Sequence, residues 1–436
     1  MSVKVAPTTA SGEDKGHILT HQVNKLESLS GSIRRENGGY SPVPGLVALV
    51  VIFAFFAVFN PSMLYPFTLQ SILLDMGSYG FVALGVVLIL IIGEIDLSVG
   101  SVAGLGSAIT GTLVQVYTMN WILAVVVGIA AGILVGVIQG LLVTKLQVPS
   151  FVITLGGLLS WQGVQLAVLH DTTLNVSSPE LSAFGSGVVS QPISWVIGVI
   201  IIVAISVQRL LPLIGKVPMR RVLLRRVGTV FGIALVVLGG IGVLGLGQGV
   251  PIVMWIYVAL VGAMGFILQQ TRSGRAVYAV GGNNEAARRA GYSPNTVRVT
   301  VFALSGGFAA LGGIFIVGRG GTADTLTGSG SLVLVAIAAA VIGGCSLFGG
   351  RGSPWAALIG AAVLATLIEG LNIANQGADL QLILEGAILV AAVAVDAVMR
   401  RRLANRGAPV TNEATVTEEA AVTAQATLIT DTKDAK

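Results

Sequence analysis

The sequence has few charged residues for its length: only 10% of its 436 residues are charged, whereas 54% are hydrophobic. A soluble domain typically carries about 25% charged residues, because its surface has to be solvated. This shortage excludes a soluble protein and indicates an integral membrane protein. The chain also has a single cysteine, Cys345, which excludes intrachain disulfides and a cysteine metal cluster.

Three further absences narrow the function. The three histidines, His17, His21 and His170, lie far apart in the sequence, so no metal site is expected. No lysine is followed by Ser or Thr, so the chain has no Walker A sequence and is not expected to hydrolyse ATP itself. Residues 1–40 are polar and contain no apolar stretch of the kind found in a signal peptide.

Apolar segments fill most of the chain, and about 20 apolar residues are needed to cross a bilayer. The sequence predicts an all-α, polytopic membrane protein with 10 to 12 transmembrane helices, because the segments 150–169 and 228–271 are the weakest. The twelve predicted spans are 45–60, 70–92, 97–118, 121–144, 150–169, 193–211, 228–247, 252–271, 299–318, 332–349, 354–373 and 380–398.

The net charge of +5 comes from basic residues in alternate gaps between these spans. Such a distribution is the topology signal of a membrane protein, and it does not indicate binding of nucleic acid. It places both termini in the cytoplasm. The basic gaps contain Lys145, Arg209, Lys216, Arg220, Arg221, Arg225, Arg226, Arg272, Arg275, Arg288, Arg289, Arg298, Arg351 and Arg400–Arg402, and the opposite gaps contain Asp171, Glu180, Asp324 and Asp379 with Arg319 alone opposing them.

The polar ends predict three regions. Residues 1–43 are expected to form a disordered cytoplasmic tail, residues 44–400 the transmembrane domain, and residues 401–436, rich in Ala, Thr and Glu, a second disordered cytoplasmic tail.

Glycine recurs at every fourth position of one predicted helix: Gly128, Gly132, Gly136 and Gly140. This spacing places a smooth stripe on one helix face, so a neighbouring backbone is predicted to pack closely there.

Few acids lie within the predicted spans, where a carrier would need them to relay ions. Asp75 lies near the start of its helix, and Asp396 is explained by a pairing with Arg400 one helical turn later. Glu369 and Glu385 remain candidates either for a substrate path or for hydrogen bonds between helices.

The basic loop 272–298 is predicted to contain a helix of about seven residues outside the membrane. Asn283 or Asn284 is expected to cap it, and Gly291 to end it. The alanines at 286, 287 and 290 leave this helix with little side-chain bulk, so it is expected to fit a narrow groove on a partner.

Four sequence blocks occur in a characteristic order: GEIDLSVGS, KLQVPSFVITLGGLL, RAVYAVGGNNEAARRAG and AVIGGCSLFGGRGSPWAALIGA. Over residues 45–400 the chain resembles the membrane permease subunits of bacterial sugar ABC importers, which include ribose, galactose and xylose permeases. Glu94 and the long insert at about 205–250 are most similar to the xylose-type branch.

The resemblance implies a multi-pass permease in the bacterial plasma membrane, surrounded by lipid, that dimerises and binds two copies of a cytoplasmic ATPase. An extracytoplasmic protein would capture the sugar. ATP and Mg²⁺ would be bound by the ATPase, and this chain itself would need no cofactor. The implied ATPase-coupling residues are Gly282, Asn284, Glu285, Ala286, Ala287, Arg288 and Gly291.

A neutral sugar can be accommodated by uncharged polar side chains, which agrees with the shortage of charge inside the spans. The residues expected to line the substrate path are Ser98, Ser101, Gln139, Thr154, Gln162, Asn372 and Asn375.

The block GEIDLSVGS places two acids between two apolar segments. Asp96 lies just before the second segment, so it is predicted to cap that helix with about 1 kcal/mol rather than to relay protons. Glu94 is expected to neutralise a basic residue of the cytoplasmic face. The predicted structural corner comprises Gly93, Glu94, Asp96, Ser98 and Gly100.

Alternatives stay open at this point. An ion-gradient-driven secondary carrier is the main one, and an ABC permease for another small polar metabolite, such as autoinducer-2, is a second. A membrane enzyme is disfavoured, because no nucleophile–base pair or metal-binding group is present. The residues alone do not distinguish import from export, although the resemblance implies import.

Overall fold

The computed structural model describes residues 42–210, 220–247, 249–328 and 330–407. The chain divides into two compact units, residues 1–390 and 391–436, and the first contains every site considered below. The predicted disordered tails lie mainly outside the described residues, as do the side chains of Asp396 and Arg400. The last helix nevertheless continues to Gly407, so the predicted boundary at residue 400 is too early.

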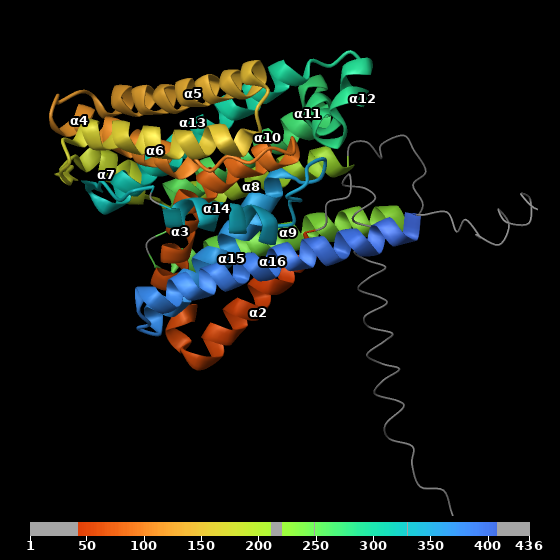
Figure 1. Ribbon diagram of the computed structural model, residues 1–436. Coiled ribbons are helices and arrows are strands. Elements are labelled where there is room, and N and C mark those ends of the chain that lie inside the picture. Colours follow the sequence, from red (N-terminus) through yellow and green to blue (C-terminus); the bar gives the residue numbers. More distant parts are fainter. Residues whose placement is uncertain (1–41, 211–219, 248, 329, 408–436) are drawn as a thin grey trace, which may run out of the picture. The chain divides into compact units, whose positions relative to one another are not determined.

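Helices make up almost all of the described chain (Figure 1). The twelve longer helices are α2 (Val43–Phe59), α3 (Pro66–Ile91), α4 (Val99–Gln115), α5 (Trp121–Leu146), α6 (Ser150–Leu169), α8 (Gln191–Leu210), α9 (Arg220–Gly245), α10 (Ile252–Gln270), α13 (Pro294–Gly320), α14 (Gly330–Ile342), α15 (Pro354–Ile373) and α16 (Ala378–Gly407). The shorter ones are η1 (Pro61–Leu64), α7 (Pro179–Ser186), α11 (Arg272–Gly282) and α12 (Asn284–Arg289).

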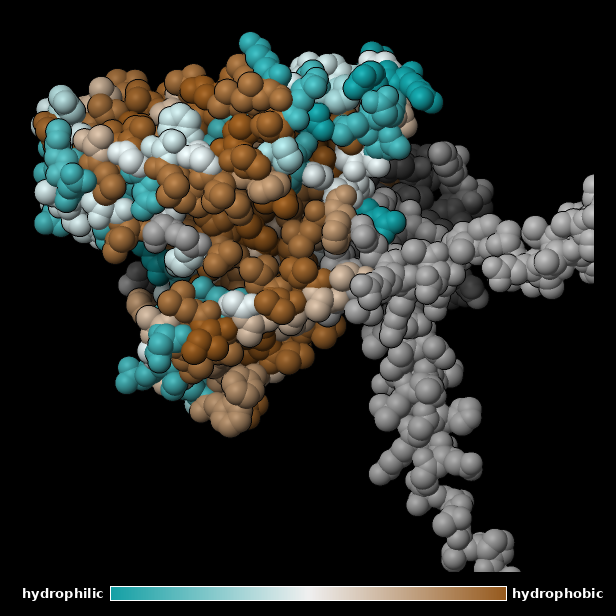
Figure 2. Space-filling view, viewed as in Figure 1, coloured by the Kyte–Doolittle hydropathy of each residue, from teal (hydrophilic) through white to brown (hydrophobic). Residues whose placement is uncertain are grey.

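Each of the twelve predicted spans overlaps one of the longer helices, and the prediction of an all-α polytopic protein is confirmed. Among the described residues, seven helices are long and apolar enough to cross a membrane: α3, α5, α6, most of α9, α10, α13 and α15. Figure 2 shows a broad hydrophobic band between two hydrophilic ends, and in Figure 1 α7 lies at one of these ends and α11 and α12 at the other.

The centre of the first unit is built on α13, which packs against α3, α4 and α5. The glycine stripe of α5 faces it: a Cβ on Gly132 would lie 2.5 Å from the Cβ of Ala310, and one on Gly140 would lie 2.8 Å from the Cα of Val299. The predicted close approach of a neighbouring backbone is therefore confirmed.

The span predicted at 332–349 is wrong in extent. Its helix, α14, ends at Ile342, and the glycine-rich segment that follows turns back, with Gly344 at φ +103°. Before α14, residues 322–328 run non-helically along α4. The Gln165 amide holds this stretch, since its Nε2 donates to the carbonyl oxygens of Asp324 at 2.9 Å and Thr327 at 3.0 Å.

Two short antiparallel strand pairs tie together the loops at the end of the unit where α7 lies. β1 (Leu174–Asn175) pairs with β4 (Thr322–Ala323), and β2 (Val188–Val189) pairs with β3 (Val250–Pro251). The basic gaps predict that this end is extracytoplasmic, opposite to α11 and α12.

Candidate functional site

The corner between α3 and α4 is a buried, hydrogen-bonded turn. Gly93 adopts φ +77°, a left-handed conformation that favours glycine. Asp96 is only 6% exposed, and its Oδ1 accepts the Ser98 N–H at 2.9 Å and the Ser98 Oγ–H at 2.6 Å. The predicted capping of α4 by Asp96 is therefore wrong. Asp96 binds Ser98, which precedes α4, whereas a capping side chain would accept an N–H of the first helical turn. Burial raises the pKa of Asp96.

Four of the residues predicted to line a substrate path lie together beside this corner, and all four are at most 3% exposed. The Gln139 Nε2 of α5 donates to the Ser98 Oγ at 2.8 Å. The Ser101 Oγ donates to the Leu158 carbonyl at 2.8 Å, and the Thr154 Oγ1 to the Ile95 carbonyl at 3.2 Å.

These bonds join α4 to α5 and α6, so in this conformation the four side chains bond within the chain. The other three predicted residues lie elsewhere: Gln162 is half-buried on α6, and Asn372 and Asn375 are exposed at the end of α15. The structure therefore does not bring the seven together, and their role as a path stays a prediction.

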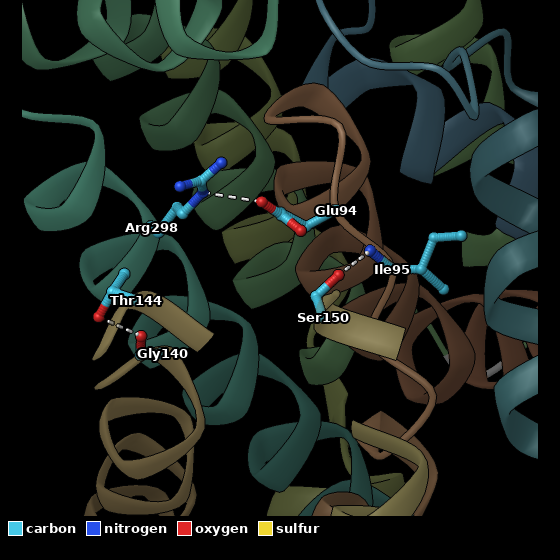
Figure 3. Close-up of polar contacts among 6 residues, drawn as sticks. All are labelled: Glu94, Ile95, Gly140, Thr144, Ser150 and Arg298. Atoms are coloured by element: carbon cyan, nitrogen blue, oxygen red, sulfur yellow. Dashed lines mark hydrogen bonds and ion pairs between the residues drawn. The ribbon is translucent and has the colours of Figure 1, made fainter. Parts of the chain in front are cut away.

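Glu94 forms an ion pair with Arg298 of α13, with 2.7 Å between the Glu94 Oε1 and the Arg298 Nε (Figure 3). Next to it, the Ile95 N–H donates to the Ser150 Oγ at the start of α6 at 3.1 Å. Glu94 therefore neutralises a basic residue of the predicted coupling loop, as expected from the sequence.

The loop 272–298 contains two helices where the sequence predicted one. In the predicted short helix, α12, the cap is Asn283, whose Oδ1 accepts the Ala286 N–H at 3.0 Å. Gly291 follows it at φ +85°. Glu285 pairs with Arg288 at 3.4 Å, and both side chains are exposed.

One of the predicted coupling residues, Ala287, does not face a partner. It is 2% exposed and packs into its own chain, so its side chain is not available to a partner in this conformation. Gly282, Glu285, Ala286, Arg288 and Gly291 are exposed, and Asn284 is half-buried. Their role in docking stays a prediction.

The other helix of this loop, α11, precedes α12 and was not predicted; its buried side chains are the small residues Ala276, Val277 and Val280. It rests on the corner through backbone contacts: a Cβ on Gly281 would overlap the Ile91 carbonyl oxygen. That oxygen accepts the Gly350 N–H at 2.9 Å, and the Tyr278 hydroxyl donates to the Gly352 carbonyl at 2.8 Å. Burial raises the pKa of Tyr278 to about 12. The segment 343–353 thus lies between α11 and the corner and is hydrogen-bonded to both.

A hollow of about 880 Å³ opens beside the Glu94–Arg298 pair. The end of α5, with Thr144 and Gln147, lines one side, and the turn from α12 to α13, with Tyr292, lines the other. The hollow adjoins the coupling loop at the predicted cytoplasmic end.

A charged contact at the opposite end was also missed. Arg319, near the end of α13, pairs with Asp75 of α3, which is 8% exposed. The signal was present in the sequence, since a buried acid needs a partner and Arg319 is the basic residue of the outer gaps. Of the two other acids considered, Glu385 accepts a hydrogen bond from Gln381 of its own helix at 3.0 Å, and Glu369 is half-buried on α15.

Comparisons with known proteins agree with this arrangement. The chain matches the family described as the permease component of branched-chain amino acid transport systems over residues 68–393. It is 32% identical over 386 residues to the xylose transport system permease protein XylH of Escherichia coli (strain K12), which covers 84% of this chain and 96% of that relative. It is 30% identical over 352 residues to the ribose import permease protein RbsC of the same organism, which covers 80% of this chain and 92% of that relative. No solved structure matches the chain to a significant degree.

An all-α bundle with a hydrophobic band and a basic loop at one end is typical of a multi-pass membrane protein. The chain belongs to the family of branched-chain amino acid transport system permease components. The predicted resemblance to sugar ABC permeases is confirmed, and the chain is a transport subunit rather than an enzyme. Membership implies, in general terms, an ATPase partner and a binding-protein partner.

Proposed function

We propose that the chain is the membrane subunit of an ATP-driven importer for a monosaccharide, xylose or a related sugar. The observation that carries this proposal is α12, a capped helix of six residues that exposes Glu285 and Ala286 at the end of the first unit. Ala287 fixes α12 to its own chain, so the opposite face, with Glu285 and Ala286, is held in place and exposed, which suits docking to a partner.

The proposed cycle begins on that partner, an ABC ATPase that binds ATP and Mg²⁺ on its own chain. Closure of the ATPase displaces α12, and the packed helices carry the displacement to the sugar path. A separate extracytoplasmic protein captures the sugar, so the path needs only weak polar contacts. The permease works as a homodimer in lipid, and its hydrophobic band contacts the acyl chains.

The test is transport by a reconstituted complex. The full chain, its ATPase and its binding protein are placed in proteoliposomes, and uptake of labelled D-xylose and D-ribose is measured with and without ATP. ATP-dependent uptake of a pentose is expected. Uptake by the chain alone, driven by a proton or sodium gradient, would overturn the proposal.

A secondary carrier is the second candidate, favoured by the Asp75–Arg319 pair, because charged residues inside spans often mark ion pathways. The gradient-driven control in the same liposomes distinguishes the two. Within the first class, a panel that adds autoinducer-2 and other small polar metabolites identifies the substrate.

A further inference from the structure

The helix α12 and the start of α13 form one connected segment. The Tyr292 N–H donates to the Ala287 carbonyl at 3.1 Å, which closes the turn after α12. Ser293 is the N-cap of α13, whose second turn carries Arg298. A displacement of α12 therefore reaches Arg298 through a short, hydrogen-bonded linker.

The corner forms a second connected segment. The Ile95 N–H donates to the Ser150 Oγ at 3.1 Å, and the Ile95 carbonyl accepts the Thr154 Oγ1–H at 3.2 Å, so the corner is fixed to α6. The buried Asp96–Ser98 turn then leads directly into α4. Whatever moves Glu94 thus acts on the starts of α4 and α6 together.

Glu94 and Arg298 join these two segments (Figure 3). Three ion pairs connect described side chains. One lies within α12, one joins α3 to the far end of α13, and this one links the coupling loop to the corner. The Glu94 side chain is 15% exposed and the Arg298 side chain 22%, so water screens the pair only in part.

The hollow of about 880 Å³ beside this pair leaves room on the side of α5. Thr144, which lines that side, donates its hydroxyl proton to the Gly140 carbonyl of its own helix at 2.8 Å rather than to Glu94. Close packing resists small shifts, whereas an ion pair at an open hollow can follow them with little loss of contact.

We propose that Glu94 and Arg298 are positioning residues for coupling: their ion pair carries the ATPase-driven displacement of α12 into the corner and thereby to α4 and α6. This inference rests on the proposed function. The ion pair determines how efficiently ATP hydrolysis drives transport, whereas binding of the ATPase depends on α12.

The experiment measures ATP hydrolysed per D-xylose or D-ribose transported by the complete complex in proteoliposomes. The variants are Glu94→Gln, Arg298→Gln, the conservative Arg298→Lys, and the double exchange of Glu94→Arg with Arg298→Glu. The matched control is Lys145→Gln, which removes one positive charge from the exposed end of α5; Lys145 does not line the hollow.

Each glutamine variant is expected to raise the ATP-to-sugar ratio at least fivefold while ATP hydrolysis stays within twofold of the parent. Arg298→Lys and the double exchange are expected to bring the ratio back to within about twofold, and Lys145→Gln to leave it unchanged. An unchanged ratio in both glutamine variants overturns the inference. So does a proportional loss of hydrolysis and transport, which indicates a purely structural pair. If the parent complex fails to transport with ATP, the proposed function itself fails.

Discussion

Arg319, near the end of α13, pairs with Asp75 of α3, so the central helix of the first unit is joined to its neighbour by charge as well as by packing. The pair lies at the end opposite to Glu94 and Arg298, which connect the corner after α3 to the other end of α13. The same helix is thus held electrostatically near both of its termini.

The first prediction concerns this outer pair. Asp75→Asn leaves Arg319 without its counter-ion, and removal of one partner of a fully buried pair costs about 3–5 kcal/mol. Because the Arg319 side chain is 30% exposed, a cost of about 1–3 kcal/mol is expected. Thermal unfolding in detergent measures it, with the exposed Asp171→Asn as the control. A melting temperature equal to that of the control would show that the pair does not stabilise the fold.

The second prediction tests the glycine stripe. Gly132→Val adds atoms where a Cβ alone would lie 2.5 Å from that of Ala310. Overpacking of this kind costs about 1–3 kcal/mol, because rigid backbones on both sides have to separate. Gly156→Val on α6 is the matched control, since a Cβ there meets nothing within 4 Å. Equal detergent stability of the two variants would contradict the packing argument.

The third prediction uses the buried acid of the corner. Asp96→Asn keeps an oxygen that can accept the Ser98 bonds, and it is expected to assemble and transport. Asp96→Ala leaves the Ser98 N–H unpaired and is expected to lose about 1–3 kcal/mol of stability. A relay acid would behave differently, because Asp96→Asn would then abolish transport while leaving assembly intact.

The fourth prediction is a pH dependence. Burial raises the pKa of Asp96 above its ordinary value of 3.8, so the folded protein binds this proton more tightly than the unfolded chain. The contribution of Asp96 to stability is therefore greatest below pH 3.8, falls as the pH rises towards the raised pKa, and is constant above it. The melting temperature of the parent relative to Asp96→Asn is expected to fall over that window. A difference that stays constant with pH would contradict the assignment.

The fifth prediction separates the two faces of α12. In Ala286→Cys the thiol is expected to react with a maleimide, and in Ala287→Cys it is expected to react at least tenfold more slowly, because Ala287 is 2% exposed. The native Cys345 is buried and gives a low background. Addition of the ATPase is expected to protect Ala286→Cys. Unaltered labelling in the assembled complex would exclude docking at this face.

Hydropathy and charge predicted the helices well, because a membrane span has to satisfy its own backbone and therefore appears as a long apolar run. The end of α12 at Gly291 was also predicted, and its cap was narrowed to Asn283 or Asn284, since both features depend on local chemistry; the structure selects Asn283. The partnership of Arg298 with Glu94 was expected in kind, and its geometry required the fold.

The features that could not be predicted from the sequence depend on contacts between segments that are distant in the chain. The inward direction of Ala287 depends on what lies beneath α12, and the helix α11 is stabilised by the corner and by residues 343–353. The polar side chains near Ser98 and Gln139 suit a sugar path by composition, and the fold uses them, in this conformation, to join three helices. From the sequence alone, uncharged polar residues that line a sugar path look the same as those that join helices by hydrogen bonds.

The non-helical stretch along α4 sets a limit on how this protein can be altered. Its carbonyl groups depend on the Gln165 amide, whose two hydrogen atoms serve a backbone that is not organised as a helix. Replacing Gln165 by leucine would make α6 more apolar and, by composition, a better membrane helix. It would also leave the half-buried carbonyl groups of Asp324 and Thr327 without the side chain that donates to them. A more apolar residue at position 165 would therefore destabilise the folded protein. At this position of the bundle, a polar side chain stabilises the membrane-embedded fold.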